Sequence, residues 1–252
     1  MHKRLIVPFL ALFLGAMVLA PAQAQGDLAG LEGVVVCLDP GHGGSDPGAV
    51  YDDGDIHLDE KEINLDVAKA VKERLEGVGA EVVLTRTDND SNPTSEERYT
   101  TANDAGADIL VSIHTNSVLK DAETRDGAMT LYFHRDDQVL AQAIYDVMYD
   151  ALKVRAEEAG LTFTSYGVGK FASRILMSSD MPGTIVEPVC MSNPVEAAWL
   201  TEPASTEGSR RAEIADAIVR GIAAYLEAND PGGDDGGQPG GGPPCDSPPC
   251  KK

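Results

Sequence analysis

Strand-like and helix-like segments alternate along the middle of this chain, and this alternation constrains the fold more than any other feature. Five short apolar runs are typical of buried strands: 33–39, 80–86, 107–114, 128–134 and 183–189. Helical patterns occupy most of the intervals and the end of the domain: 60–79, 95–106, 138–159 and 210–228. Such alternation favours an α/β layered fold. We therefore expect one domain, a mainly parallel twisted sheet flanked by helices on both faces.

The two ends of the chain have compositions that place them outside this domain. Residues 1–24 begin with Lys3 and Arg4, continue as a short apolar run and end in small residues, which predicts a signal peptide. The alternative is a membrane anchor, but a bilayer span needs about 20 apolar residues. Residues 230–252 are rich in Gly, Pro and Asp and predict a disordered tail. The domain is then 27–229, exported to a periplasm or the medium, with no membrane span left after cleavage.

The charge of the chain argues against one class of partner. The formal net charge is −21, and removal of Lys3 and Arg4 with the leader, which contains no acid, lowers it to −23. Binding to nucleic acid needs a basic face, so nucleic acid is excluded as a partner. An acidic surface does not attract anionic polymers either, so a polymeric substrate has to be held locally.

Four cysteines are present, and none has the spacing of a zinc knuckle. Cys37 and Cys190 lie in apolar, strand-like segments, where we expect buried free thiols. Cys245 and Cys250 lie close together in the tail, where export permits a disulfide. The sequence does not decide the pairing.

Polar residues with metal-binding side chains stand at the predicted ends of elements. His42 follows the first strand in a Gly-rich turn, His114 ends the third strand, and Glu60 opens the first helix. In parallel sheets the chemistry collects at the carboxyl ends of the strands. Two His and one Glu suit a hydrolytic zinc site, which takes three protein ligands and leaves a place for water. Spacing alone favours the simpler reading of solvated or capping residues, because no HExxH pair is present.

Five sequence segments, taken in order, favour the zinc site over solvated or capping residues. They are "LDPGHGGSDPGA", "EKEINLDVAKAVKERL", "VLTRTD", "ADILVSIHTNS" and "GTIVEPVCMSNPVEA". In this order and spacing the chain resembles the zinc-dependent N-acetylmuramoyl-L-alanine amidases with a type 3 catalytic domain, from about Val34 to Leu226. The resemblance implies a Zn²⁺ cofactor held by His42, Glu60 and His114. It also implies that Glu187 is the catalytic glutamate.

The resemblance further implies a reaction and a substrate, peptidoglycan. Zinc-activated water, with Glu187 as general base, would cut the amide bond between N-acetylmuramic acid and L-alanine of the stem peptide. Asn116, Arg86 and Asp39 are secondary candidates for contact with the substrate. Asp39 and Asp46 flank His42, and either could orient a ligand or shape the turn, with turn chemistry favoured for Asp46. His57 is assigned to a solvated loop.

Some members of this family carry an internal helix that plugs the zinc site. The interval between His114 and Glu187 is filled by one predicted strand, one helix and a connecting loop, so we expect no plug helix. Three rival functions stay open: a zinc carboxypeptidase acting on the stem peptide, a catalytically silent wall-binding protein, and a purely structural envelope protein. The carboxypeptidase would usually carry a His-x-x-Glu pair, which is missing at His42 and His114.

Overall fold

The computed structural model describes residues 28–118 and 125–229, and the predicted signal peptide and tail lie outside these residues. The helices are η1 (Ala29–Leu31), α2 (Glu60–Glu76), α3 (Ser95–Asp104), α4 (Asp137–Glu158), α5 (Arg174–Ser178), α6 (Pro194–Trp199) and α7 (Arg210–Ala228). The strands are β1 (Val35–Pro40), β2 (Val50–Asp52), β3 (His57–Asp59), β4 (Glu81–Leu84), β5 (Ile109–Ile113), β6 (Asp126–Tyr132), β7 (Phe163–Lys170) and β8 (Gly183–Glu187).

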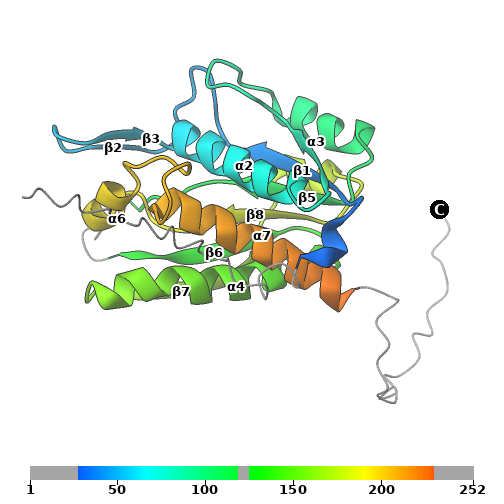
Figure 1. Cartoon of the computed structure of the whole chain (residues 1–252). Coiled ribbons are helices and arrows are strands. Elements are labelled where there is room, and N and C mark those ends of the chain that lie inside the picture. Colours follow the sequence, from blue (N-terminus) through cyan, green and yellow to red (C-terminus); the bar gives the residue numbers. More distant parts are fainter. Residues whose placement is uncertain (1–27, 119–124, 230–252) are drawn as a thin grey trace, which may run out of the picture.

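Six strands form the central sheet in the order β4-β1-β5-β8-β6-β7 (Figure 1). β4, β1, β5 and β8 are parallel to one another, whereas β6 pairs with β8 in the antiparallel sense and β7 runs parallel to β6. The expected mainly parallel sheet is confirmed. β6 runs in the opposite direction because it begins at the end of the sheet where the carboxyl terminus of β5 lies. From there the chain runs back toward the end at which β5 began.

Helices cover the two faces of the sheet unequally. On one face α7 packs between α2 and α4, and the large hydrophobic core lies beneath these three helices. On the other face α3 and α5 pack together over a much smaller cluster. The alternation of side chains along β1 shows this division, since Leu38 enters the large core and Cys37 the small one. Cys37 and Cys190 are both buried and free, as expected.

Several elements of the fold were not predicted from the sequence patterns. β7 reads "FTSYGVGK", and its glycines at 167 and 169 remove the apolar alternation by which a strand is recognised. The interval between His114 and Glu187 therefore holds β7 and α5 where only a connecting loop was expected. β2 and β3 form a hairpin of three-residue strands, too short to show a period. α6 is equally short and begins at an Asn193 cap with Pro194 following.

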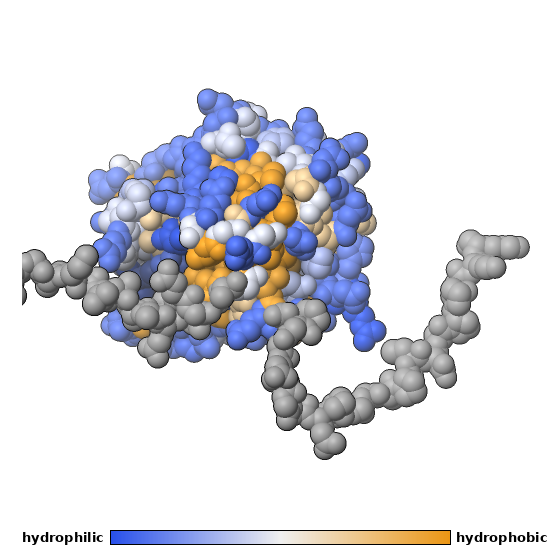
Figure 2. Space-filling view, turned by 45° about the vertical axis from the view of Figure 1, so that its right-hand side comes forward, coloured by the Kyte–Doolittle hydropathy of each residue, from blue (hydrophilic) through white to orange (hydrophobic). Residues whose placement is uncertain are grey.

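Figure 2 shows a face that is mostly hydrophilic around one apolar area. Within residues 28–118 and 125–229, none of the helices combines the length with the apolar character that a bilayer span requires.

α4 and α7 approach so closely that a helix position has to be glycine. A Cβ placed on Gly221 of α7 would lie 2.7 Å from Cα of Ile144 in α4. The obstacle is backbone, which a change of side-chain rotamer does not move. Gly221 therefore sets the spacing of the two helices.

Gly221→Ala should lower the free energy of unfolding by about 1–3 kcal/mol through overpacking. Urea unfolding of the purified domain measures this. Trimming the neighbour in the double variant with Ile144→Val should not restore stability, because the contact is with the main chain. A gain of about 1 kcal/mol, as alanine gives in an unobstructed helix, would contradict the close approach.

Candidate active site

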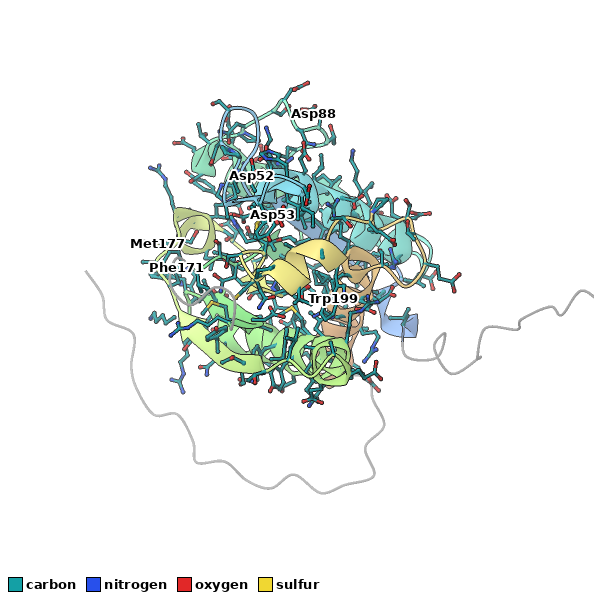
Figure 3. All side chains as sticks on the ribbon, turned by 90° about the vertical axis from the view of Figure 1, so that its left-hand side faces the viewer. Asp52, Asp53, Asp88, Phe171, Met177 and Trp199 are labelled. Carbon is teal, nitrogen blue, oxygen red and sulfur yellow. The ribbon has the colours of Figure 1, made fainter. Side chains whose placement is uncertain are left out.

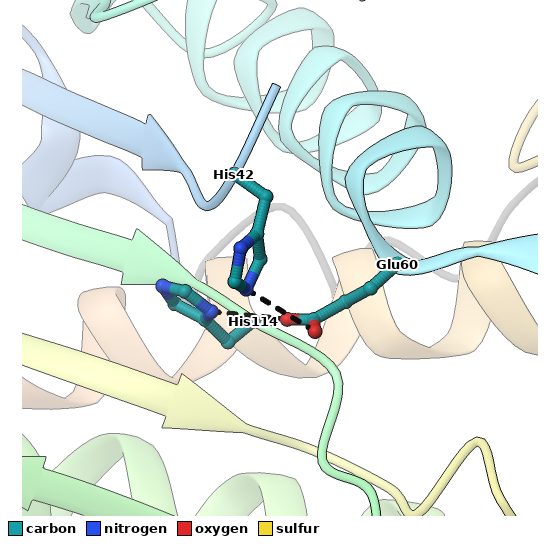
Figure 4. A group of neighbouring side chains, drawn as sticks. All are labelled: His42, Glu60 and His114. Carbon is teal, nitrogen blue, oxygen red and sulfur yellow. Dashed lines mark hydrogen bonds and ion pairs between the residues drawn. The ribbon is translucent and has the colours of Figure 1, made fainter. Parts of the chain in front are cut away.

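Three side chains that the sequence singled out meet at the carboxyl edge of the sheet. His42 follows β1, His114 follows β5, and Glu60 is the first residue of α2. Each offers one ligand-type atom, and these atoms all lie within 4.8 Å of one another (Figure 4). This edge is on the side of the molecule that carries the β2–β3 hairpin with Asp52 and Asp53 (Figure 3).

The Glu60 carboxylate lies between the two imidazoles. Its Oε2 is 3.2 Å from His42 Nε2, and its Oε1 is 3.0 Å from His114 Nδ1. The rings stand nearly perpendicular, with centroids 4.9 Å apart and an interplanar angle of 81°. About a quarter of each imidazole is exposed, whereas Glu60 is buried. Two nitrogens and a carboxylate that converge below an open surface form a donor set that fits a metal ion.

The Gly-rich loop after β1 makes this approach possible. A Cβ on Gly41 would lie 2.3 Å from the His114 ring, so any other residue would collide with that side chain. His42 itself has a φ of 62°, in the left-handed region that residues with a side chain seldom occupy. Strain of this kind persists where the surroundings enforce it. Here Arg98 Nη2 donates to the His42 carbonyl at 2.8 Å.

Further hydrogen bonds fix the Glu60 carboxylate. Oε1 accepts from Asn64 Nδ2 at 3.1 Å and from the Thr115 amide at 3.2 Å, and Oε2 accepts from the Ala49 amide at 2.9 Å. Burial alone would raise the pKa of Glu60, but the hydrogen bonds to His114 and His42 outweigh it and hold the pKa well below its usual range. Glu60 is therefore ionised, the form in which a carboxylate binds a metal.

Both imidazoles respond to this negative charge. The hydrogen bond to Glu60 raises the pKa of His42 to about 9, against the opposing effect of burial. Burial lowers the pKa of His114, but the hydrogen bond to Glu60 and the charge of Glu187 outweigh it and raise the pKa overall. A site that attracts protons in this way also attracts a metal cation, which competes with protons for the same nitrogens.

Glu187 ends β8 directly beside His114. The parallel pairing of β5 with β8 joins Ile113 to Val186, and the His114 amide donates to the Val186 carbonyl at 3.0 Å. Glu187 is partly exposed as a residue, but its Oε2 is buried and has no hydrogen-bond partner among the described residues. Burial raises the pKa of Glu187 to about 7, reinforced by the charge of Glu60 and opposed by the two imidazoles. A carboxyl group with such a pKa can both take and return a proton near neutral pH.

Asp39 and Arg86, two of the candidates for substrate contact, lie behind the His42 loop. Asp39 is fully buried, and its carboxylate accepts from Thr85 Oγ1 at 2.6 Å, Arg98 Nη1 at 2.7 Å and Ser112 Oγ at 2.7 Å. Arg86 is 3% exposed and donates to the carbonyls of the same loop, Pro40 from Nε and Gly41 from Nη2, each at 2.9 Å. In this arrangement both side chains support the loop from beneath.

The other named residues have distinct surroundings. Asn116 lies in an isolated bridge with Cys190, and its Nδ2 is 3.5 Å from Met129 Sδ. His57 is on β3 and well exposed, between Asp52 and Asp59, and does not belong to the ligand group. Asp46 combines its expected turn bond with a bond to His42 Nδ1 at 2.9 Å.

Three supporting residues were missed by sequence reasoning: Asn64, Arg98 and Thr115. Asn64 had a readable signal, since it stands one helical turn after Glu60, where side chains at i and i+4 are neighbours. Arg98 reaches the loop from α3, which no local pattern indicates.

Two His and one Glu that could hold a metal ion, beside a carboxyl group of raised pKa at the end of β8, fit the site of a metal-dependent hydrolase. Comparison with known proteins specifies the family. The family model described as N-acetylmuramoyl-L-alanine amidase matches residues 36–224. The chain belongs to this family, whose members act on peptidoglycan.

Individual relatives agree with this assignment. The germination-specific N-acetylmuramoyl-L-alanine amidase of Bacillus subtilis is 29% identical over 217 residues, covering 80% of this chain and 84% of that protein. The B. subtilis protein YqiI is 35% identical over 214 residues, covering 84% and 93%. Among solved structures, the N-acetylmuramoyl-L-alanine amidase from Clostridium difficile 630 superposes with a TM-score of 0.67 at 28% identity, covering 78% of this chain and 98% of that one.

Asp39→Asn should lower the free energy of unfolding of the metal-free protein at pH 7 by about 3–5 kcal/mol, because it leaves the Arg98 guanidinium buried without its counter-charge. Arg98 and the hydroxyls of Thr85 and Ser112 outweigh burial and lower the pKa of Asp39 in the folded state. The stabilisation is therefore complete above the unfolded pKa, about 3.9, and is lost as the pH falls through the folded pKa.

Urea unfolding of both proteins at several pH values measures this difference, which should shrink below about pH 4. Asp216→Asn is the control, since Asp216 forms an exposed pair with Arg74 and should change stability by no more than about 1 kcal/mol. Equal effects of the two substitutions would contradict the assigned role of Asp39.

Proposed function

We propose that this chain hydrolyses the amide bond between N-acetylmuramic acid and the L-alanine of the stem peptide, with Zn²⁺ held by His42, Glu60 and His114 and with Glu187 as general base. The observation that carries the proposal is the buried, unpartnered Oε2 of Glu187 beside the three converging ligand atoms. An orphaned buried carboxylate is costly, and it is found where chemistry uses it.

The donor set supports zinc over other common metals. Two imidazoles and one carboxylate are the ligands of hydrolytic zinc sites, whereas Mg²⁺ and Ca²⁺ prefer oxygen alone. When bound, zinc supplies Lewis-acid chemistry, lowering the pKa of water and polarising a carbonyl. The protein contributes the ligand atoms and the surrounding fixed charge.

Glu187 handles the proton. Its Oε2 takes a proton from the attacking water and then delivers it to the departing amine of L-alanine, so that the amide is replaced by a carboxylic acid and a free amine. Its high pKa suits both steps. Asn116 lies two residues after His114 and is partly exposed, and it is the candidate for contact with the stem peptide.

The elements between β5 and β8 decide whether an internal helix could block the site. Within 125–182, β6 and β7 belong to the sheet, α4 packs on the large core, and α5 packs against α3. These helices are thus engaged elsewhere in the fold, and we propose that the domain acts without displacement of an internal helix. We also propose export to a periplasm or the medium, which the composition of residues 1–24 and the cell-wall substrate support.

Metal removal should abolish turnover, and zinc should restore it. The zinc-loaded protein, without envelope extract, should release stem peptides beginning with L-alanine from purified peptidoglycan, as identified by mass spectrometry. Release of terminal D-alanine would instead indicate the carboxypeptidase, and binding without release would indicate a silent wall-binding protein. Activity that appears only with extract would contradict the absence of internal inhibition.

Glu187→Gln should lower kcat by about 10²–10⁴-fold while zinc content stays near one per chain, because the amide keeps the shape but cannot take a proton. Metal analysis and the peptide-release assay measure the two properties separately. Glu81→Gln, at an exposed position of β4, is the matched control and should leave both unchanged. Retained turnover in Glu187→Gln would rule out the assignment of the base.

A further inference from the structure

The loop that follows His42 folds so that one of its side chains, Asp46, contacts the His42 ring. Gly43 and Asp46 exchange two backbone hydrogen bonds, from Gly43 N to Asp46 O at 3.0 Å and from Asp46 N to Gly43 O at 2.9 Å. This closed turn brings the Asp46 carboxylate within reach of the His42 ring. Asp46 Oδ2 is 2.9 Å from His42 Nδ1, and since a carboxylate only accepts, the proton of this bond belongs to Nδ1.

The second carboxylate oxygen of Asp46 binds the backbone segment that lies against Glu60. Oδ1 accepts from the Gly48 amide at 3.0 Å, and Gly48 has a φ of +70°. A Cβ at Gly48 would lie 2.6 Å from both Glu60 Oε2 and His42 Cδ2, so this backbone passes directly against two of the ligands. The next amide, of Ala49, donates to Glu60 Oε2 at 2.9 Å.

We propose that Asp46 is a positioning residue of the metal centre: one oxygen keeps the proton on His42 Nδ1 and leaves Nε2 facing the metal, and the other keeps the Gly48–Ala49 backbone on Glu60. The inference rests on the zinc site of the proposed function. Outer carboxylates that orient a ligating imidazole affect metal affinity, typically by 10–100-fold. Asp46 adds a link to the second ligand through the main chain.

The simpler interpretation is that Asp46 only shapes its turn, and the chain contains a matched example of that role. Asp53 in the hairpin loop caps its own turn, with Oδ1 accepting from the amides of Asp55 at 3.0 Å and Ile56 at 2.8 Å. Asp53 is exposed, its Oδ2 accepts from the Tyr51 hydroxyl at 3.0 Å, and none of its hydrogen bonds among the described residues reaches His42, Glu60 or His114. Asp46 is also about half exposed, so truncating either residue leaves no buried cavity.

Zinc affinity separates the two roles. Wild type, Asp46→Ala, Asp46→Asn and Asp53→Ala are titrated with zinc against a chromophoric chelator. We expect Asp46→Ala to raise the zinc dissociation constant by about 10–100-fold. Asp46→Asn should have a smaller effect, because its amide oxygen still accepts one of the two hydrogen bonds. Asp53→Ala should match wild type.

Two further measurements exclude a general loss of structure. The thermal midpoints of metal-free Asp46→Ala and Asp53→Ala should fall by similar small amounts, because both side chains are exposed and each variant loses only the hydrogen bonds of one turn. In ¹⁵N-histidine-labelled protein, the protected Nδ1–H signal of His42 should be present in wild type and in Asp53→Ala and absent in Asp46→Ala.

The outcomes distinguish this inference from the function on which it rests. If wild type binds zinc and Asp46→Ala binds it equally well, or if Asp46→Ala and Asp53→Ala weaken zinc binding alike, the positioning role is overturned while the proposed function stands. If wild type itself does not bind zinc, the proposed function fails, and the role of Asp46 fails with it.

Discussion

The buried contact between Asp39 and Arg98 is the interaction on which the site depends. Through Thr85, Ser112 and Arg98, the Asp39 carboxylate joins the end of β1 to the end of β4, to β5 and to α3. Arg98 also donates to the carbonyls of Pro40 and His42, in the loop that carries the His42 side chain. A buried ion pair is rarely a large source of stability, but removing one partner is severe. Its value here lies in the single geometry it imposes on the His42 loop.

Two glutamates in one site have opposite protonation behaviour because their surroundings differ. Glu60 lies between two imidazoles and accepts hydrogen bonds from Asn64, Thr115 and Ala49, so it is ionised and suited to bind a cation. Glu187 has one oxygen that is buried and has no partner within residues 28–118 and 125–229, and burial raises its pKa to about 7. A pair of carboxyl groups whose pKa values are pushed apart is the usual arrangement for dividing structural and proton-transfer roles.

The elements that could be predicted from the sequence are those whose pattern lies within one short segment of the chain. The strands β1, β4, β5, β6 and β8 appeared as apolar runs, and the helices α2 and α7 as apolar periods. His42 and His114 stood at predicted strand ends, but their assignment as ligands together with Glu60 came from the resemblance to the amidase family. β7 was missed because Gly167 and Gly169 erase its pattern. Arg98 and Thr115 were missed because their contacts join residues far apart in the chain. For Asp46 the sequence left two roles open, shaping the turn and orienting a ligand, because residue types alone do not reveal its bond to His42.

The position of β8 in the sheet has a consequence for the order of folding. β8 is the last strand in the sequence, yet it lies between β5 and β6 at the centre of the sheet. The three ligand residues come from a continuous stretch ending at β5, whereas Glu187 arrives only when β8 inserts. Contacts between nearby segments form at a lower entropic cost than those between distant ones. The three proposed ligands therefore belong to the first half of the domain, and the proposed base joins them only through the last strand, at the centre of the sheet.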